Sequence, residues 1–176
     1  MTPVFPRSTA RITLRRLSES DLADFQAYRQ CEELSRYQGW VPQPDSEASA
    51  FLNEMASAEL FQPGIWAQIG IADGSNDKLI GDMGVCISAD GQYAEIGFTL
   101  SDTYHGKGLA SEAVRETISM LFEANDIQRV IGITDSRNIP SIQLLERVGM
   151  KLASTDRAMF RGQDCDEHTY LVERPL

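Results

Sequence analysis

The stretch Tyr-His-Gly-Lys-Gly-Leu-Ala-Ser-Glu-Ala (104–113) joins a predicted strand to a predicted helix. Glycines at 106 and 108 let the backbone come close to a ligand, and the N–H groups at a helix start point in one direction. Together with the positive end of the helix dipole they form an anion site, to which Lys107 adds a cation. The alternative is a plain strand-to-helix turn in which glycine only relieves the backbone.

Two familiar phosphate-binding loops do not fit this stretch. A Walker loop places its Lys after the second glycine, followed by Ser or Thr, but Lys107 lies between the glycines. The dinucleotide fingerprint needs a third glycine where Ser111 stands. A nucleotide-binding regulator that uses the loop in another way stays open as a minor alternative.

Hydrophobic periodicity on both sides of the loop predicts a β–α–β unit over 93–134. Turn residues at 73–77 and 89–91 predict antiparallel pairing of the three strands that precede the loop, 65–72, 78–88 and 92–100. The remaining elements are strands over 11–17, 129–134, 150–160 and 167–173, and helices over about 21–31, 46–60, 109–125 and 141–148, with a loop over 36–44. Ser18 or Ser20 is expected to cap the first helix and Ser46 the second. The pattern predicts one mixed α/β (α+β) domain over 1–176.

Composition limits the class of protein. The chain has 176 residues, 42% hydrophobic and 24% charged, which is ordinary for a single globular domain. Acidic residues number 26 against 16 Lys and Arg, for a formal charge of −10. This balance argues against nucleic acid and anionic membrane as partners, and it is compatible with a cationic small molecule or a basic peptide.

The cysteines and histidines predict neither disulfides nor a metal site. Cys31, Cys86 and Cys165 lie far apart and are odd in number, and the two histidines are His105 and His168. The first residues lack the apolar run of a signal peptide. A reducing cytoplasm is therefore the expected compartment.

The loop and three further segments carry a family resemblance. His-Gly-Lys-Gly-Leu-Ala (105–110) resembles the [Q/R]-x-x-G-x-[G/A] signature of the GNAT superfamily of N-acetyltransferases, preceded by Ala-Glu-Ile-Gly-Phe-Thr-Leu (94–100). The segment 138–150 is similar to the family's N-x-x-S/A…E-x-x-G-F pattern, and Arg-Tyr-Gln-Gly-Trp (36–40) resembles a feature of the RimJ/RimL-like branch. The resemblance covers about residues 10–174.

This resemblance implies a mostly antiparallel mixed sheet of six to seven strands flanked by about four helices. It implies acetyl-CoA as cosubstrate, with its pyrophosphate on the loop and its pantetheine arm along the splayed strand before the loop. The residues that it assigns to acetyl-CoA are Phe98, Thr99, Leu100, His105, Gly106, Lys107, Gly108, Leu109, Ala110, Ser111, Asn138 and Ser141. A backbone N–H near Leu100 would polarise the thioester carbonyl.

Catalysis of amine acetylation needs a proton acceptor, and Glu95 is the first candidate. Its alternative role is a hydrogen bond or ion pair across the sheet. Asp82 is a rival base that is otherwise expected on a solvated strand face, and a water chain is a third option. Leu145 stands where several family members have a Tyr acid, so Ser141 becomes the substitute donor, although a Ser there is also an ordinary first-turn residue. Asn138 is also a candidate helix cap.

Other residues have less specific expectations. Tyr37 and Trp40 either wall an acceptor pocket or cover the edge of the core, while His168 is expected at the surface or in sheet packing. His105 is expected as a loop residue. Cys86 is expected in the core, so no cysteine is placed to form a covalent acetyl-enzyme. We therefore expect the amine to attack the thioester directly in a ternary complex.

The resemblance implies that the acceptor is a protein N-terminus or a small amine, and a homodimer is compatible with the family. The alternative function is a catalytically silent acetyl-CoA-binding module.

Overall fold

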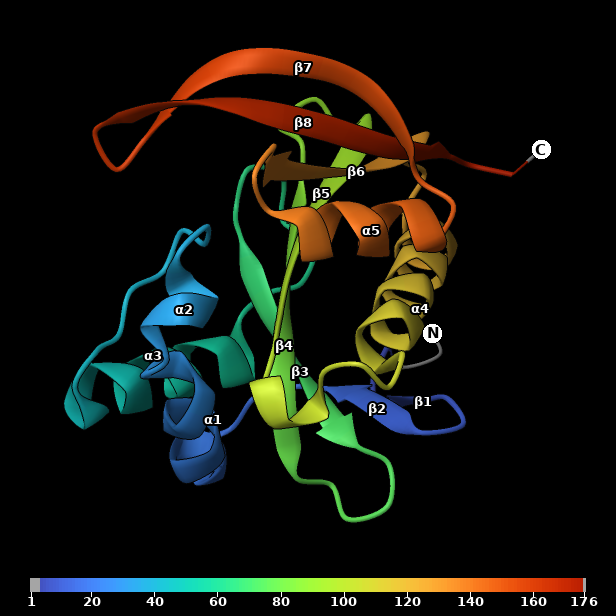
Figure 1. The fold of residues 1–176 in the computed structure, drawn as a ribbon. Coiled ribbons are helices and arrows are strands. Elements are labelled where there is room, and N and C mark those ends of the chain that lie inside the picture. The colour runs from blue at the N-terminus through green and yellow to red at the C-terminus, as the bar shows by residue number, and fades with distance from the viewer. Residues whose placement is uncertain (1–3, 176) are drawn as a thin grey trace.

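The structure is a computed structural model and describes residues 4–175 of the chain. A continuous sheet organises this part of the chain. Its eight strands lie in the order β1-β2-β3-β4-β5-β6-β8-β7 (Figure 1). The strands are β1 (Arg7–Ser8), β2 (Ile12–Arg15), β3 (Ala67–Asp73), β4 (Leu79–Ile87), β5 (Tyr93–Leu100), β6 (Arg129–Asp135), β7 (Lys151–Phe160) and β8 (Gln163–Glu173). Within the described residues β5 and β6 are the parallel pair, and every other pairing is antiparallel.

The helices follow the predicted order with small differences. They are α1 (Leu22–Arg29), α2 (Glu32–Ser35), α3 (Asp45–Ser57), α4 (Leu109–Ala124) and α5 (Ile139–Arg147), with single 3-10 turns η1 (Glu19–Asp21) and η2 (Asp102–Tyr104). The sequence prediction missed β1 and α2, which are too short to show a period. Ser46 does not cap α3, because the helix already begins at Asp45 after Pro44. Neither Ser18 nor Ser20 caps α1, whose N-cap residue is Asp21. Ser18 instead caps the preceding turn η1, and its backbone N–H donates to the Asp21 carboxylate at 2.9 Å.

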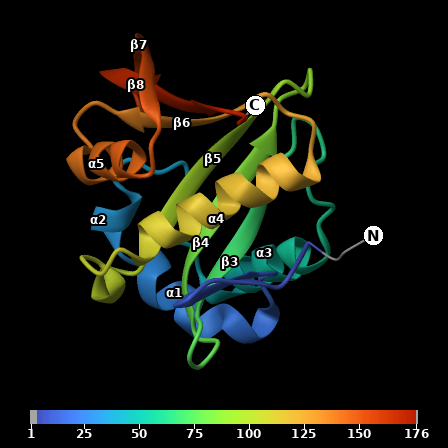
Figure 2. The ribbon, with the colours of Figure 1, turned by 90° about the vertical axis from the view of Figure 1, so that its right-hand side faces the viewer.

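Two apolar layers cover the sheet, one on each face. Alternate residues of a strand point to opposite faces. Ile80 of β4 packs in the larger core with Leu121 of α4, while Leu79 packs in a second core with Phe25 of α1 and Leu52 of α3. Figure 2 shows α4 lying across one face of the sheet, the face that carries the larger core. The second face, with α1 and α3, is therefore free to carry a site away from α4.

The carboxyl-terminal half adds α5 and a long hairpin. Leu145 of α5 is buried with Met150 and Tyr170, against Ile118 of α4. The outer strand β7 is exposed over most of its length and arches with β8 above the rest of the sheet (Figure 1). All three cysteines are free thiols. Among the helices of residues 4–175, none is long and apolar enough to cross a membrane.

A fork opens between the two parallel strands. On one side β5 pairs with β4 as far as Leu100 opposite Gly81. On the other side its pairing with β6 ends at Ile96 opposite Gly132, although β6 continues to pair with β8 as far as Asp135. The last residues of β5 therefore present a free edge toward β6.

Candidate active site

The loop after β5 has the geometry of an anion site. Gly106 and Gly108 have φ values of 73° and 77°, in the left-handed region that glycine adopts without strain. The first bond of α4 runs from the Glu112 N–H to the Gly108 carbonyl. The N–H groups of the first turn before it have no acceptor within the helix, and they point out of its positive end.

Arg11 is a cation at this loop that the sequence prediction missed. Its Nη1 donates to the Lys107 carbonyl at 2.7 Å, and its Nε donates to Glu112 Oε2 at 2.8 Å. A Cβ on Gly108 would lie 3.4 Å from Arg11 Nη2. The Lys107 ammonium instead donates to the Thr103 carbonyl at 3.2 Å. Arg11 lies 96 residues before Lys107 in the chain, so no local pattern indicates the contact.

The hydrogen-bonding pattern of β5 decides which of its peptide groups face the fork between β5 and β6. Ser88 N–H donates to the Tyr93 carbonyl and Ser101 N–H to the Ile80 carbonyl. These bonds place the odd-numbered residues of β5 in hydrogen-bonded pairs with β4, and the peptide groups of Phe98 and Leu100 turn toward β6. Thr99 therefore differs from its two neighbours, because its peptide groups turn toward β4.

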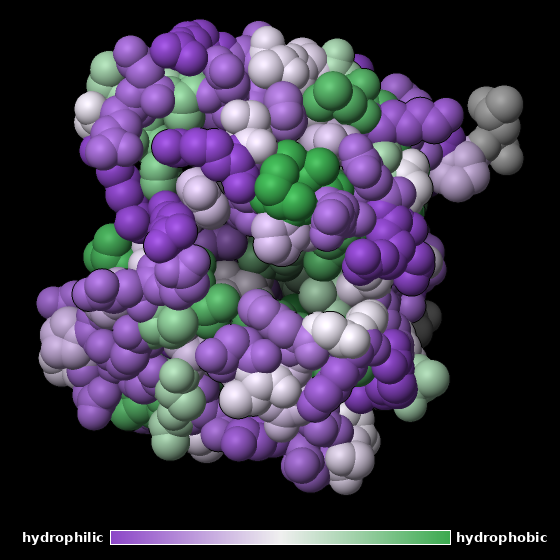
Figure 3. All heavy atoms as spheres, in the orientation of Figure 1, coloured by the Kyte–Doolittle hydropathy of each residue, from purple (hydrophilic) through white to green (hydrophobic). Residues whose placement is uncertain are grey.

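Two side chains hold carbonyls at the fork. Gln38 Nε2 donates to the Phe98 carbonyl at 3.2 Å, and His105 Nε2 lies 2.7 Å from the Leu100 carbonyl. The N–H groups of Phe98 and Leu100 remain directed into the fork. Figure 3 shows that the surface is hollowed near the centre of the view, with hydrophobic side chains gathered around the hollow.

The start of α5 follows the carboxyl end of β6. Asn138 is the cap of α5, and its Oδ1 accepts a bond of 3.4 Å from the Ser141 N–H. Ser141 is half-buried in the first helical turn. Leu145, where the resemblance led us to expect a Tyr acid in other family members, is buried, and its Cδ2 would lie 3.0 Å from a Cβ on Gly132. Position 145 therefore supplies packing and no proton donor.

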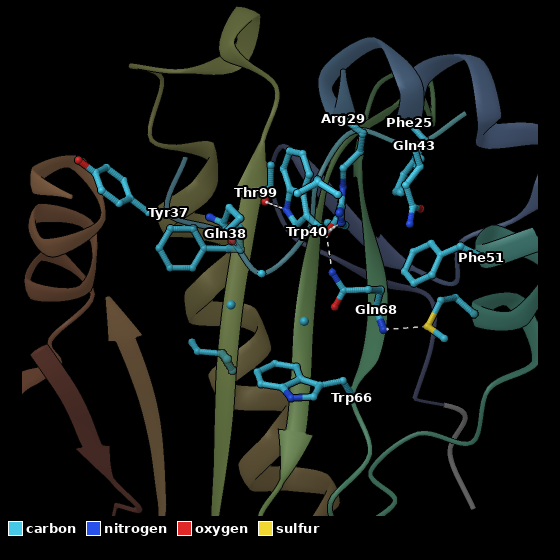
Figure 4. Close-up of a pocket in the computed structure, with 18 of the residues that line it drawn as sticks. Phe25, Arg29, Tyr37, Gln38, Trp40, Gln43, Phe51, Trp66, Gln68 and Thr99 are labelled. Atoms are coloured by element: carbon cyan, nitrogen blue, oxygen red, sulfur yellow. Dashed lines mark hydrogen bonds and ion pairs between the residues drawn. The ribbon is translucent and has the colours of Figure 1, made fainter. Parts of the chain in front are cut away.

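A cavity of about 690 Å³ lies on the face of the sheet opposite α4. Glu95, Gly97 and Thr99 of β5 line its floor. Its aromatic lining residues are Phe25, Tyr37, Trp40, Phe51, Trp66 and Phe98. Figure 4 shows Trp40 close to Thr99, and the indole Nε1 of Trp40 donates to Thr99 Oγ1 at 3.2 Å. Tyr37 and Trp40 thus line a pocket, as one of their two expected roles required.

Asp82 is not on a solvated strand face, so that expectation is wrong. The residue is 1% exposed, and its carboxylate accepts bonds from Arg29 Nη2 at 2.7 Å, from Gln68 Nε2 at 2.8 Å and from the Tyr28 hydroxyl. Burial, followed by the charge of Asp82, raises the pKa of Tyr28 well above its ordinary value. With its oxygens occupied in this way, Asp82 is poorly placed to accept a proton from a ligand.

Glu95 has the opposite surroundings. Its half-buried carboxylate lines the cavity and has no hydrogen-bond partner within residues 4–175. Burial raises the pKa of Glu95, and the nearby charge of Glu167 raises it further. The structural bond across the sheet that was the alternative for Glu95 is therefore not formed among these residues. A carboxylate with a raised pKa and free oxygens is suited to proton transfer.

Cys86 and His168 lie in surroundings that do not favour a catalytic role. Cys86 lies opposite Glu95 in the sheet, and burial, then the charge of Glu95, raises the pKa of its thiol, which disfavours the nucleophilic thiolate. His168 Nδ1 lies 2.8 Å from Thr155 Oγ1, and its ring packs edge-on against Tyr170. His168 thus packs in the sheet, as expected.

Comparison with known proteins agrees with this geometry. Residues 11–151 match the family model described as acetyltransferase (GNAT) domain. The uncharacterized N-acetyltransferase p20 of Bacillus licheniformis is 29% identical over 144 residues, 81% of this chain and 80% of that protein. A GNAT-family acetyltransferase from Bacillus anthracis superimposes with a TM-score of 0.85 at 19% identity, covering 96% and 98% of the two chains.

A second solved structure has the same fold. RimL, a ribosomal alpha-N-protein acetyltransferase in complex with coenzyme A, superimposes with a TM-score of 0.81 at 18% identity, covering 95% of this chain and 96% of that one. The fold is the mixed α/β fold of these proteins, with eight strands where six to seven were expected. The chain belongs to the GNAT family and is an acyltransferase.

Proposed function

We propose that the protein transfers an acetyl group from acetyl-CoA to a primary amine, by direct attack of the amine within a ternary complex. The observation that carries the proposal is the fork between β5 and β6, which ends in the glycine loop at the start of α4. A free strand edge continuous with an anion site matches a ligand made of an amide-bearing arm and a pyrophosphate.

The residues at the fork fit acetyl-CoA. The N–H groups from Gly106 to Ser111, among them those of Leu109 and Ala110, would hold the pyrophosphate, with the Lys107 backbone fixed by Arg11. The peptide groups of Phe98 and Leu100 would bind the pantetheine amides as an added strand does. His105 would act by holding the end of β5, and Asn138 by positioning the first turn of α5.

Glu95 is the proposed general base. Acetyl-CoA supplies the activated acetyl group as a thioester. The Glu95 carboxylate takes a proton from the ammonium in the cavity, directly or through water, and its raised pKa makes it a stronger base than an exposed Glu. The Leu100 N–H polarises the carbonyl, and the Ser141 hydroxyl hydrogen-bonds the departing thiolate.

The acceptor is proposed as a primary amine of one of two kinds. The name of the RimL neighbour supports a protein N-terminal amine, and the cavity supports a small amine. The three free thiols support a reducing cytoplasm as the compartment. The chain is proposed to act as one domain, of which residues 1–3 and 176 lie outside the described part. The homodimer stays a prediction, and sedimentation velocity measures the oligomeric state directly.

A thermal-shift series followed by a turnover assay tests the proposal. Acetyl-CoA should raise the melting temperature, because a ligand of the folded state stabilises it by mass action, and ATP or NAD at equal concentration should raise it much less. CoA release should then depend on an added amine, with the acetylated product identified by mass spectrometry. Binding without release would indicate the silent module, and stabilisation by ATP alone would indicate a nucleotide-binding protein.

A further inference from the structure

We propose that the acceptor is a small arylalkylamine, a primary ammonium on an aromatic body without a carboxylate. The inference rests on the proposed function and deepens it by naming the substrate class. Four features of the cavity carry it: its apolar walls, its charge, its open floor and the engagement of its polar groups.

The walls are aromatic, and apolar side chains stand exposed at their rim. Val41, Trp66 and Ile133 are 55%, 46% and 41% exposed, and all three line this cavity. Leaving side chains of this size in water is unfavourable, so their gathering at one opening indicates an apolar ligand. Figure 4 shows Trp40 and Trp66 on the same side of the strands, with Phe51 and Gln68 beside them.

The charge of the lining selects a cation. Its charged residues are Arg29, Asp82 and Glu95. Arg29 and Asp82 neutralise each other at 2.7 Å, which leaves Glu95 as the uncompensated charge among the described lining residues. An ammonium gains from this carboxylate and from the aromatic faces, whereas a second carboxylate on the ligand is repelled.

The floor has room for a ring between Glu95 and Thr99. Gly97 lies between them on the same face of β5, and a Cβ there would have no atom within 4 Å. Gly84, its partner on β4, is covered by Gln68 and Trp66, because a Cβ there would lie 2.6 Å from Gln68 Oε1 and 3.1 Å from Trp66 Cζ3. The bare backbone at Gly97 leaves a flat slot that the Trp66 indole and the Gln68 amide border on the side of β4.

Three glutamines of the lining already use their amide nitrogens as donors within the protein. Gln38 donates to the Phe98 carbonyl, Gln68 to Asp82 and Gln26 to the Gln43 carbonyl. An extended peptide acceptor needs donors for its own backbone carbonyls, and these three amide donors are engaged elsewhere. A volume of about 690 Å³ suits a ligand of small-molecule size. The cavity therefore favours a small amine over a peptide.

Intrinsic fluorescence tests the ligand class without turnover, because both tryptophans of the chain line the cavity. The probes are 2-phenylethylamine, ethylamine, phenylalanine and a tetrapeptide that begins with Ser. We expect 2-phenylethylamine to bind at least about tenfold more tightly than each of the others, and to give the highest kcat/KM in acetyl-CoA-dependent CoA release. Phenylalanine is the matched control for the carboxylate, and ethylamine for the ring.

Gly97→Val tests the slot. A β-branched residue suits a strand, and open space receives it, so the variant should fold, keep acetyl-CoA binding and bind 2-phenylethylamine at least about tenfold more weakly. Ser154→Val on the exposed strand β7 is the control and should change neither affinity. Gly97→Ala, with a smaller intrusion, replaces the valine variant if that one does not fold.

The outcomes separate the two proposals. Fluorescence change with 2-phenylethylamine but no CoA release with any amine would overturn the acetyltransferase function. CoA release that favours ethylamine or the serine peptide, or an unchanged 2-phenylethylamine affinity in Gly97→Val, would overturn the arylalkylamine class and leave the acetyltransferase function in place.

Discussion

The Arg29 guanidinium lies 2.7 Å from the Asp82 carboxylate, with both side chains buried, and its carbon lies 4.3 Å from the centre of the Trp40 ring. One arginine thus neutralises a buried acid and supports a wall of the cavity. A buried pair of this kind adds little over an apolar substitute, but removal of one partner leaves a charge unpaired in a dry site.

Asp82→Asn should therefore act on stability. We expect a loss of about 3–5 kcal/mol in the free energy of unfolding, because Arg29 keeps its charge without its partner. Urea denaturation at neutral pH measures the loss. A stable Asp82→Asn protein with abolished turnover would instead make Asp82 a catalytic base.

Arg161 should affect the acceptor side of the site. At the tip of the β7–β8 hairpin, its Nη2 lies 2.9–3.0 Å from the carbonyls of Ser35, Gln38 and Trp40. Arg161→Ala frees the segment that carries Tyr37 and Trp40, so we expect KM for the amine to rise several-fold with acetyl-CoA affinity unchanged. Steady-state kinetics with each substrate varied measure this, and an equal rise in both KM values would contradict a wall-positioning role.

Gly108→Val should weaken acetyl-CoA binding far more than Lys107→Ala. Valine is strained at a φ of 77°, and its Cβ would approach Arg11 Nη2 and the N–H groups that hold the anion. Lys107→Ala removes an exposed charge, with an expected cost of at most about 1 kcal/mol. Calorimetric titration with acetyl-CoA compares the two, and equal losses would speak against a site built on backbone N–H groups.

The ionised Glu95 carboxylate should lower the stability of the folded protein at neutral pH. Its pKa is raised in the folded state, so between the unfolded and folded pKa values the native protein binds more protons, and stability falls as pH rises through this window. Glu95→Gln removes this pH-dependent loss of stability. We expect the variant to melt higher than wild type at pH 7 and to lose that advantage at a pH below the ordinary Glu pKa. An equal difference at both pH values would show that the titration is not responsible.

Local sequence patterns predicted the elements that we propose as the acetyl-CoA site. The change from period 2 to period 3.6 around 104–113 located the loop between β5 and α4, and the cap at Asn138 followed from its place before Ser141. Both are contacts between neighbours in the chain. Residue type and spacing are enough to define them.

The acceptor side depended on long-range contacts. The pairing of Asp82 with Arg29 spans 53 residues, and the bond of Arg161 to Gln38 spans 123. Nothing at position 82 distinguishes a buried carboxylate from a solvated one, because the partners come from α1 and β3. Gly97 likewise reads as an ordinary strand glycine until the empty space above it is known.

The turnover of Glu95→Gln as a function of pH tests the central claim most directly. Gln keeps the size of the side chain but cannot accept a proton. With a small amine in excess and acetyl-CoA affinity measured in parallel, kcat at pH 7 should fall by about 10²–10⁴-fold, and the deficit should shrink as rising pH leaves more amine unprotonated. Wild-type turnover by Glu95→Gln at pH 7, or a deficit that does not change with pH, would contradict acetyl transfer with Glu95 as the base.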